Sequence, residues 1–193
     1  MVVLAAVSLN IFCAAQTPEW QPRHLEELSI AHHRIAKQLL EILRSAAKTS
    51  FDSGVCEIPP DVEQRSSLRF VKLASNGRTQ VIVQGVGECQ CSPTGNCSFW
   101  IYEKSANGYR PLLATDMVQV FSVENTRSHG YRDIVTGAHG SAVDTDLTVF
   151  KFDGEHYQPR ECWRMSYPQT VDSKSYRIVG KSTLEKRDCY HSH

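Results

Sequence analysis

The chain has 193 residues, 41% of them hydrophobic, and its 21 basic and 21 acidic residues give a formal net charge of zero. This balance produces no field that would attract nucleic acid or an anionic membrane, and no aromatic-basic stacking motif is present. The length predicts one globular domain with a sizeable core. We therefore expect no nucleic-acid partner, and the sequence indicates no cofactor.

The N-terminal residues 1–15 are small and apolar, and Cys13-Ala14-Ala15 before Gln16 is typical of a signal-peptide cleavage site. No Lys or Arg precedes the apolar run, so a buried N-terminal segment is the alternative. The run is too short to span a bilayer comfortably. We expect residues 16–193 to form one exported domain, periplasmic or extracellular, with no membrane span after signal removal.

Residues 22–48 show the periodicity of a helix. Apolar side chains recur at spacings of three and four, which predicts an amphipathic helix, and the stripe includes Leu25, Leu28, Ile35, Leu39 and Ile42. The stripe is broad, which favours packing on a sheet over a coiled coil. Residues 51–66 contain Gly54 and Pro59-Pro60 and are predicted to be a connector.

Residues 68–162 alternate apolar and polar positions in eight short runs, separated by turn residues such as Asn76-Gly77. Short links favour antiparallel neighbours in a single meander. Tyr109, Tyr131 and Tyr157 each follow a polar turn and are expected to open a strand. The predicted fold is α+β: one long N-terminal helix on an antiparallel β-meander of about eight strands, stapled by disulfides. Residues 163–193 are assigned to a C-terminal segment.

Two resemblances fall in this β-rich region. The stretch "SHGYRDIV" resembles the Gly-x-x-Asp signature of FG-GAP-type propeller repeats, but Asn125, Arg127 and His129 stand where that family has calcium-binding carboxylates. No calcium site is therefore expected. The stretches "TGNC", "GYRDI", "HGSA" and "FDG" are similar to those of small exported bacterial proteins, and this second resemblance implies no activity.

Cysteines cluster in "ECQCSPTGNCSFW", where zinc, redox and disulfide roles compete. The Cys89-x-Cys91 spacing is tight for zinc and is not the redox Cys-x-x-Cys, so disulfides are favoured. Cys91 with Cys97 would close a small loop around Pro93 and Gly95. Cleavage of the signal would leave six cysteines whose pairing the sequence does not select: Cys56, Cys89, Cys91, Cys97, Cys162 and Cys189.

The C-terminal "DCYHSH" could bind a transition metal through Cys189, His191 and His193. A disulfide anchor followed by a short tail is favoured instead, so no metal site is predicted.

The segment 136–146 gathers His139, Ser141 and Asp144, the residue types of a hydrolytic triad. It lacks a Gly-x-Ser-x-Gly elbow, and side chains at 139 and 141 would project in parallel from one strand face. The alternative is a strand end at which Gly137 and Gly140 allow a bulge. A hydrolase using His139 with Ser141 and Asp144 is thus the second functional hypothesis.

The first hypothesis is an exported, non-catalytic binding module for an unidentified protein or glycan, because no coherent catalytic constellation is present. An inhibitor of a wall-degrading enzyme is one concrete form. Three polar-aromatic loops supply the candidate binding residues: Ser92, Thr94, Asn96, Asn107, Tyr109, His129 and Tyr131.

Overall fold

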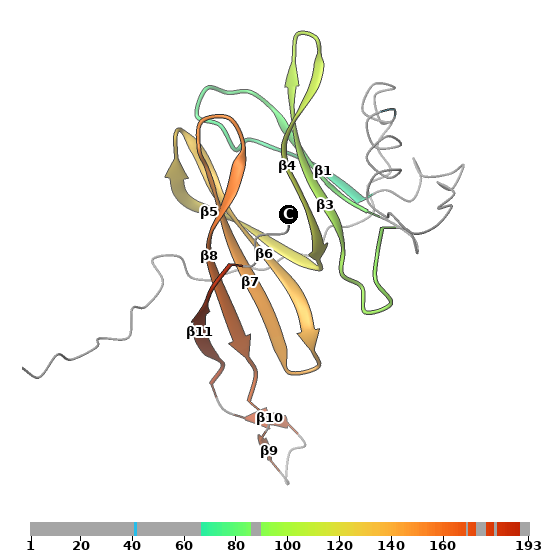
Figure 1. The fold of residues 1–193 in the computed structure, drawn as a ribbon, viewed down its shortest axis with the longest axis vertical. Coiled ribbons are helices and arrows are strands. Elements are labelled where there is room, and N and C mark those ends of the chain that lie inside the picture. The colour runs from blue at the N-terminus through green and yellow to red at the C-terminus, as the bar shows by residue number, and fades with distance from the viewer. Residues whose placement is uncertain are drawn as a thin grey trace, which may run out of the picture.

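The computed structural model describes residues 41, 67–85, 90–168, 170–172, 177–179 and 181–189. Eleven strands lie in these ranges (Figure 1): β1 (Ser67–Val71), β2 (Gln80–Gln84), β3 (Cys97–Ser105), β4 (Gly108–Val118), β5 (Val120–Ser128), β6 (Tyr131–Ser141), β7 (Asp144–Phe152), β8 (Tyr157–Ser166), β9 (Thr170–Asp172), β10 (Arg177–Val179) and β11 (Thr183–Arg187).

The strands form two main antiparallel sheets. The first sheet has the order β1-β2-β3-β4, and the second has the order β11-β8-β7-β6-β5. β9 and β10 pair only with each other in the described structure. Each of the eight strands expected from alternation is present, because side chains on successive positions point to opposite sides of a pleated strand.

The α+β prediction is wrong for the described part of the chain, which is 70% strand and 1% helical. The single meander is also wrong, since the strands divide between two sheets. The helix expected over 22–48 lies outside the described residues except Glu41, and the signal, residues 1–15, and the connector, residues 51–66, lie outside entirely. Within residues 163–193, the predicted C-terminal segment, β8 runs to Ser166 and β11 pairs with β8 in the second sheet.

The division between the sheets occurs where β4 passes into β5. Met117 has a left-handed backbone with φ of 61°, which is uncommon for a residue other than glycine. The next residue but one, Gln119, donates its N–H to the Gly137 carbonyl of the second sheet at 2.8 Å. The chain therefore leaves the first sheet at this bend, and β5 starts the second.

The core lies between the sheets. Alternate residues of the first sheet, including Ile82, Phe99 and Ile101, are fully buried against residues of the second sheet such as Phe121 and Ile134. At one end of this core three rings pack together, with Tyr131 stacked on Phe152 at 4.0 Å and Tyr157 edge-on to both. Tyr131 and Tyr157 open β6 and β8 as predicted, while Tyr109 is the second residue of β4.

Candidate functional site

The "GYRDI" stretch at the start of β6 has a structural role at each position. Gly130 has φ of 83°, which suits the tight turn from β5. Arg132 donates to the carbonyls of Val123 and Glu124 at 2.9 and 2.6 Å, where β5 carries two extra residues relative to β6. Asp133 is buried and accepts the Ser128 hydroxyl at 2.8 Å, and Ile134 lies in the core.

Tyr131 of this stretch contacts the carboxylate of Glu103, a residue that is fully buried. Its oxygens accept hydrogen bonds from Tyr131 (2.6 Å), Gln80 (2.8 Å), Arg110 (2.9 and 3.0 Å) and Arg78 (3.1 Å). Burial alone would raise the pKa of Glu103, but these four partners together lower it below its ordinary value. The carboxylate accepts five hydrogen bonds and is therefore not available as a base. Because Tyr131 belongs to the second sheet and Gln80 and Arg110 to the first, the carboxylate links the two sheets.

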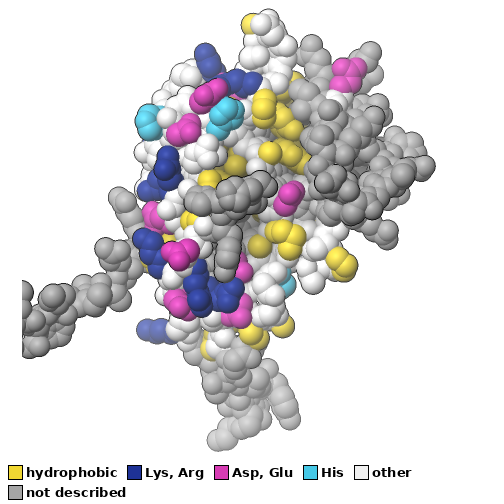
Figure 2. Space-filling view, in the orientation of Figure 1, with side chains coloured by type: hydrophobic (Ala, Val, Ile, Leu, Met, Phe, Trp, Pro, Cys, Tyr) yellow, Lys and Arg dark blue, Asp and Glu magenta, His cyan; other side chains and the backbone are white. Residues whose placement is uncertain are grey.

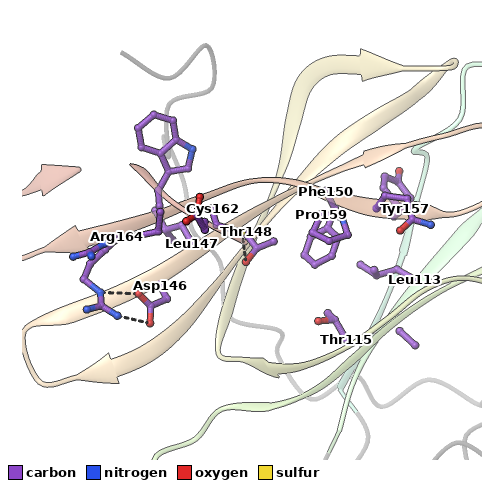
Figure 3. A pocket seen from close by; sticks show the side chains of 15 residues that line it. Leu113, Thr115, Asp146, Leu147, Thr148, Phe150, Tyr157, Pro159, Cys162 and Arg164 are labelled. Carbon is purple, nitrogen blue, oxygen red and sulfur yellow. Dashed lines mark hydrogen bonds and ion pairs between the residues drawn. The ribbon is translucent and has the colours of Figure 1, made fainter. Parts of the chain in front are cut away.

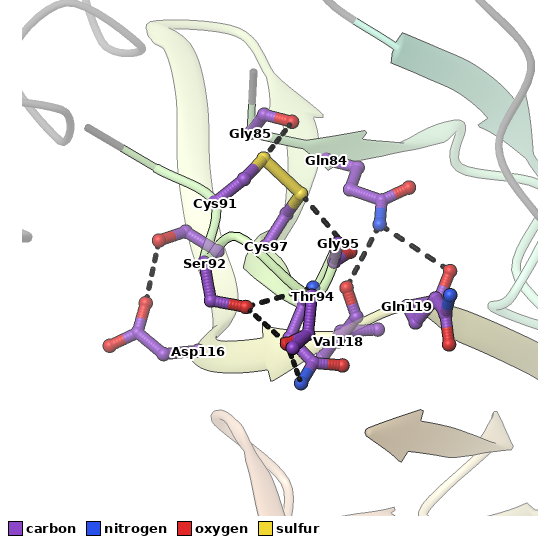
Figure 4. Close-up of a disulfide and its surroundings, with 12 residues drawn as sticks. Gln84, Gly85, Cys91, Ser92, Thr94, Gly95, Cys97, Asp116, Val118 and Gln119 are labelled. Atoms are coloured by element: carbon purple, nitrogen blue, oxygen red, sulfur yellow. Dashed lines mark hydrogen bonds between the residues drawn. A yellow bond between two sulfur atoms is a disulfide. The ribbon is translucent and has the colours of Figure 1, made fainter. Parts of the chain in front are cut away.

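The loop between Cys91 and Cys97 is closed by a disulfide, as predicted (Figure 4). Inside it, the Gly95 N–H donates to the Ser92 carbonyl at 2.9 Å, and Gly95 has φ of 84°. The hydroxyls of Ser92 and Thr94 hydrogen-bond to each other at 2.8 Å. Proline and glycine therefore form a tight turn that the disulfide fixes to the start of β3.

Asn96 fastens this loop to the second sheet. Its side-chain N–H donates to the His139 carbonyl at 2.9 Å, and its side-chain oxygen accepts the His139 N–H at 2.7 Å. The amide thus takes the place of a neighbouring strand beside β6. Asn96 is buried and fully engaged, so its contribution is structural.

The structure brings only part of the predicted hydrolytic group together. Ser141 donates its hydroxyl to Asp144 at 3.2 Å, and Ser166 donates to the same carboxylate at 2.6 Å. The Ser166 hydrogen bond is the main cause that lowers the pKa of Asp144, which makes this carboxylate a weaker base. The described structure shows His139 exposed and joined to its neighbours only through backbone atoms, so its imidazole does not activate Ser141. A bulge occurs between His139 and Ser141, around Gly140, whereas Gly137 lies in regular pairing.

The predicted binding loops do not converge on one surface. The loop of Ser92 and Thr94 contacts β6 near His139, whereas His129 and Tyr131 stand at the opposite end of that strand. Eight residues separate the two ends, a distance of roughly 27 Å in extended chain. Asn107 lies at the exposed tip of the β3–β4 hairpin, and Tyr109 is half-buried beside it. His129 hydrogen-bonds to the Phe152 carbonyl at 2.8 Å, and the Tyr131 ring is buried.

A cleft that the sequence did not reveal lies between β4 and the β7–β8 pair (Figure 3). Its volume is about 630 Å³, within the range of small-molecule and peptide sites. One end is apolar and is lined by Leu113, Phe150, Pro159 and Tyr157. Leu113 and Thr115 point into it from β4, towards the side chains of the second sheet.

The other end of the cleft is polar and charged. Arg164 on β8 binds Asp146 on β7 with two hydrogen bonds, of 2.8 and 3.2 Å, and this carboxylate raises the pKa of Arg164. Glu185 of β11 pairs with Arg164 on its other side in the register. Thr148 and Arg187 complete this end. Figure 2 shows acidic and basic side chains gathered on the face over β7, β8 and β11. The cleft therefore offers apolar contact at one end and paired charges at the other.

Sequence reasoning missed the cleft because it depends on how two sheets stack. The only signal was the alternation in "DLTVFKF", which places Asp146, Thr148 and Phe150 on neighbouring alternate positions, with Arg164 in the next strand. That pattern indicates a sheet face with a polar and an apolar end, but it does not indicate that β4 forms the opposite wall.

The second described disulfide joins Cys162 to Cys189 and holds β11 near the cleft. Cys56, Cys89, His191 and His193 lie outside the described residues. In the described ranges, no group of three or more His, Cys, Asp or Glu residues is placed to hold a metal ion. None of the helical structure described is long and apolar enough to cross a membrane.

Comparison with known proteins adds no relative: no family model, curated protein or solved structure matches the chain. A functional assignment therefore depends on the geometry described above.

Proposed function

We propose that the protein is a non-catalytic binding module that acts outside the cytoplasm and holds its ligand in the cleft between β4 and β7–β8. The observation that carries the proposal is the composition of this cleft, with Leu113 and Phe150 at one end and the Asp146–Arg164 pair at the other. Such a site favours a ligand with an apolar part and a polar part that can form several hydrogen bonds, as peptides and substituted glycans do.

Further observations support binding over hydrolysis, and others support export. The Ser141 hydroxyl is engaged by Asp144, and His139 does not line the cleft. Two disulfides are consistent with an oxidising compartment, which supports export. We propose, as part of the same function, that the chain is related to the small exported bacterial proteins that its sequence resembles.

Ligand binding in the cleft can be tested with a substitution that fills it. Wild-type protein is titrated with peptidoglycan fragments, chito-oligosaccharides and short peptides, and binding is followed by NMR chemical shifts. Thr115→Trp should abolish binding, because a large ring would occupy the cleft that Thr115 lines. Thr126→Trp is the matched control, since Thr126 is another half-buried strand threonine and does not line the cleft. Binding that survives Thr115→Trp would place the ligand elsewhere.

The hydrolase alternative is tested separately. A screen of ester, peptide, phosphate and glycoside substrates should find no turnover. Any turnover that is found should persist within about tenfold in His139→Ala, because a general base contributes on the order of 10² or more. Activity that vanishes in the folded His139→Ala variant would reassign the protein as an enzyme.

One observation favours the inhibitor form of the binding hypothesis. The β3–β4 hairpin continues past β2, whose pairing with β3 stops at Glu103, and its tip from Lys104 to Asn107 is exposed. A protruding hairpin of this kind can enter the cleft of an enzyme. Inhibition of peptidoglycan hydrolases, measured by the turbidity of a cell-wall suspension, should be lost in Ala106→Arg. It should persist in Ala142→Arg, which alters an exposed alanine in the β6–β7 turn. Equal inhibition by both variants would show that the β3–β4 hairpin does not bind the enzyme.

A further inference from the structure

The edges of the two sheets differ in how they are protected against pairing with another strand. β4 carries Pro111 and two bulges, and β5 carries two extra residues in its pairing with β6. β11 has three charged residues among its five. Prolines, bulges and charges all block the addition of a further strand.

β1 has a different character. Its five residues pair with β2 in unbroken register, without a bulge or a proline. Phe70 lies on this edge strand and is 51% exposed. An exposed apolar residue on a sheet edge favours association with another chain. In the described sheets, β1 is thus the one edge that combines regular geometry with an exposed aromatic ring.

A groove of about 520 Å³ runs between β1 and β5. Lys72 and Arg132 line it against the single acidic residue Glu124, which gives an excess of positive charge. The Arg132 guanidinium is held by the carbonyls of Val123 and Glu124 and by the side-chain oxygen of Asn125, so its charge is fixed beside the groove, and none of these described partners is a carboxylate.

We infer that β1 is a docking edge for an acidic, extended segment of a partner protein. The segment would add as a strand beside β1, with an apolar side chain on Phe70 and carboxylates towards the groove cations. At about 3.3 Å per residue, roughly five to seven residues would span the edge. A second copy of this chain fits less well, because its own Lys72 would add positive charge to the same groove.

The test uses the full chain and two blocked seven-residue peptides, one of alternating glutamate and valine and one with lysine in place of glutamate. Binding is measured by NMR titration, with shifts expected in β1 and β5. The acidic peptide should bind at least about tenfold more tightly than the basic one, and the difference should shrink in high salt.

Two variants locate the site. Phe70→Ser should weaken binding of the acidic peptide at least about fivefold. Met117→Ser is the matched control, because Met117 is also 51% exposed but lies at the bend between β4 and β5. Lys72→Glu should reduce or reverse the preference for the acidic peptide.

Thr115→Trp, which fills the cleft, should leave this binding unchanged, so the two proposals can fail independently. Equal affinity for both peptides, shifts confined to other strands, or an unaltered affinity in Phe70→Ser would overturn the inference. So would a dimer in sedimentation that Phe70→Ser abolishes, since a second copy would then take the edge.

Discussion

Among single side chains, Glu103 shows how a charge can be kept in an apolar core. It is fully buried, and residues from β2, β4 and β6 and the loop before β2 donate to it. Gln80, one of these donors, also accepts the Leu73 N–H at 2.8 Å through its side-chain oxygen. A carboxylate in this position is costly to bury and much more costly to leave unpaired.

Glu103→Gln should lower the free energy of unfolding by about 3 kcal/mol or more, because Arg110 and Arg78 lose the negative charge they surround. Lys104→Gln, at the exposed neighbouring position, should change it by less than about 0.5 kcal/mol. Urea melts of both variants provide the measurement. Similar small shifts in the two would show that the charge at position 103 is unimportant.

The same carboxylate predicts a dependence on pH. Its pKa is lower in the folded chain than in the unfolded chain, so its stabilisation is fully present above the ordinary carboxyl range and is lost as pH falls through the folded pKa. The stability advantage of wild type over Glu103→Gln should be constant from about pH 8 to about pH 5 and shrink below that. Melts across this series test the sign, and an advantage that grows on acidification would refute it.

At the scale of single elements, β6 organises the second sheet. It begins at the buried Tyr131, passes Gly137 and ends where the amide of Asn96 pairs with its backbone. A Cβ atom at Gly137 would lie 2.8 Å from Val120 and 3.1 Å from Leu147, so only glycine lets the three strands pack this closely.

Gly137→Ala should destabilise the protein by about 1–3 kcal/mol through overpacking. Gly140→Ala should cost less than about 1 kcal/mol, because the nearest atom to its Cβ, at 3.3 Å, is a carboxylate oxygen of Asp146 that can move. Thermal melts of the pair check the difference. A larger loss for Gly140→Ala would show that the bulge, and not the close packing, limits this strand.

Asn96→Asp removes the N–H that reaches the His139 carbonyl and puts a carboxylate in its place. We expect a loss of about 2 kcal/mol or more, because a buried acceptor is left without its donor. Asn107→Asp, at the exposed β3–β4 turn, should be nearly neutral. Chemical denaturation of the two variants tests whether the disulfide loop is attached to β6 through this amide.

At the scale of the whole molecule, two disulfides close chain segments of very different length. Cys91 and Cys97 are separated by 6 positions, and Cys162 and Cys189 by 27. In the chain-entropy description, a crosslink stabilises by restricting the unfolded chain, more so for a longer loop.

Replacing Cys162 and Cys189 by serine should therefore cost about 3.5 kcal/mol, against about 2.5 kcal/mol for Cys91 and Cys97. Calorimetry of the two double variants gives the comparison. A larger loss at Cys91 and Cys97 would mean that the short disulfide acts mainly by positioning Asn96 in the folded state.

The strands could be predicted from the sequence because alternation is a local property, and Tyr131 and Tyr157 open strands as expected. The division into two sheets could not be predicted, because it depends on a left-handed backbone conformation at Met117. No glycine or other typical turn residue occupies that position. The cleft could not be predicted from the sequence for a related reason. Thr115 and Thr148 come to line the same cleft only when the two sheets stack. Loop chemistry marked Asn96 as a ligand-binding residue, but its amide serves the backbone of β6.

The Cys162–Cys189 disulfide should let the folded protein tolerate a proteolytic cut. Any single cut between these two residues leaves the fragments covalently joined, and β11 stays paired with β8 along its five residues. Lys181 is exposed in this span just before β11 begins and is a natural site for trypsin-like cleavage. A nicked molecule would thus keep the charged wall of the cleft, and it would separate into two pieces only after reduction.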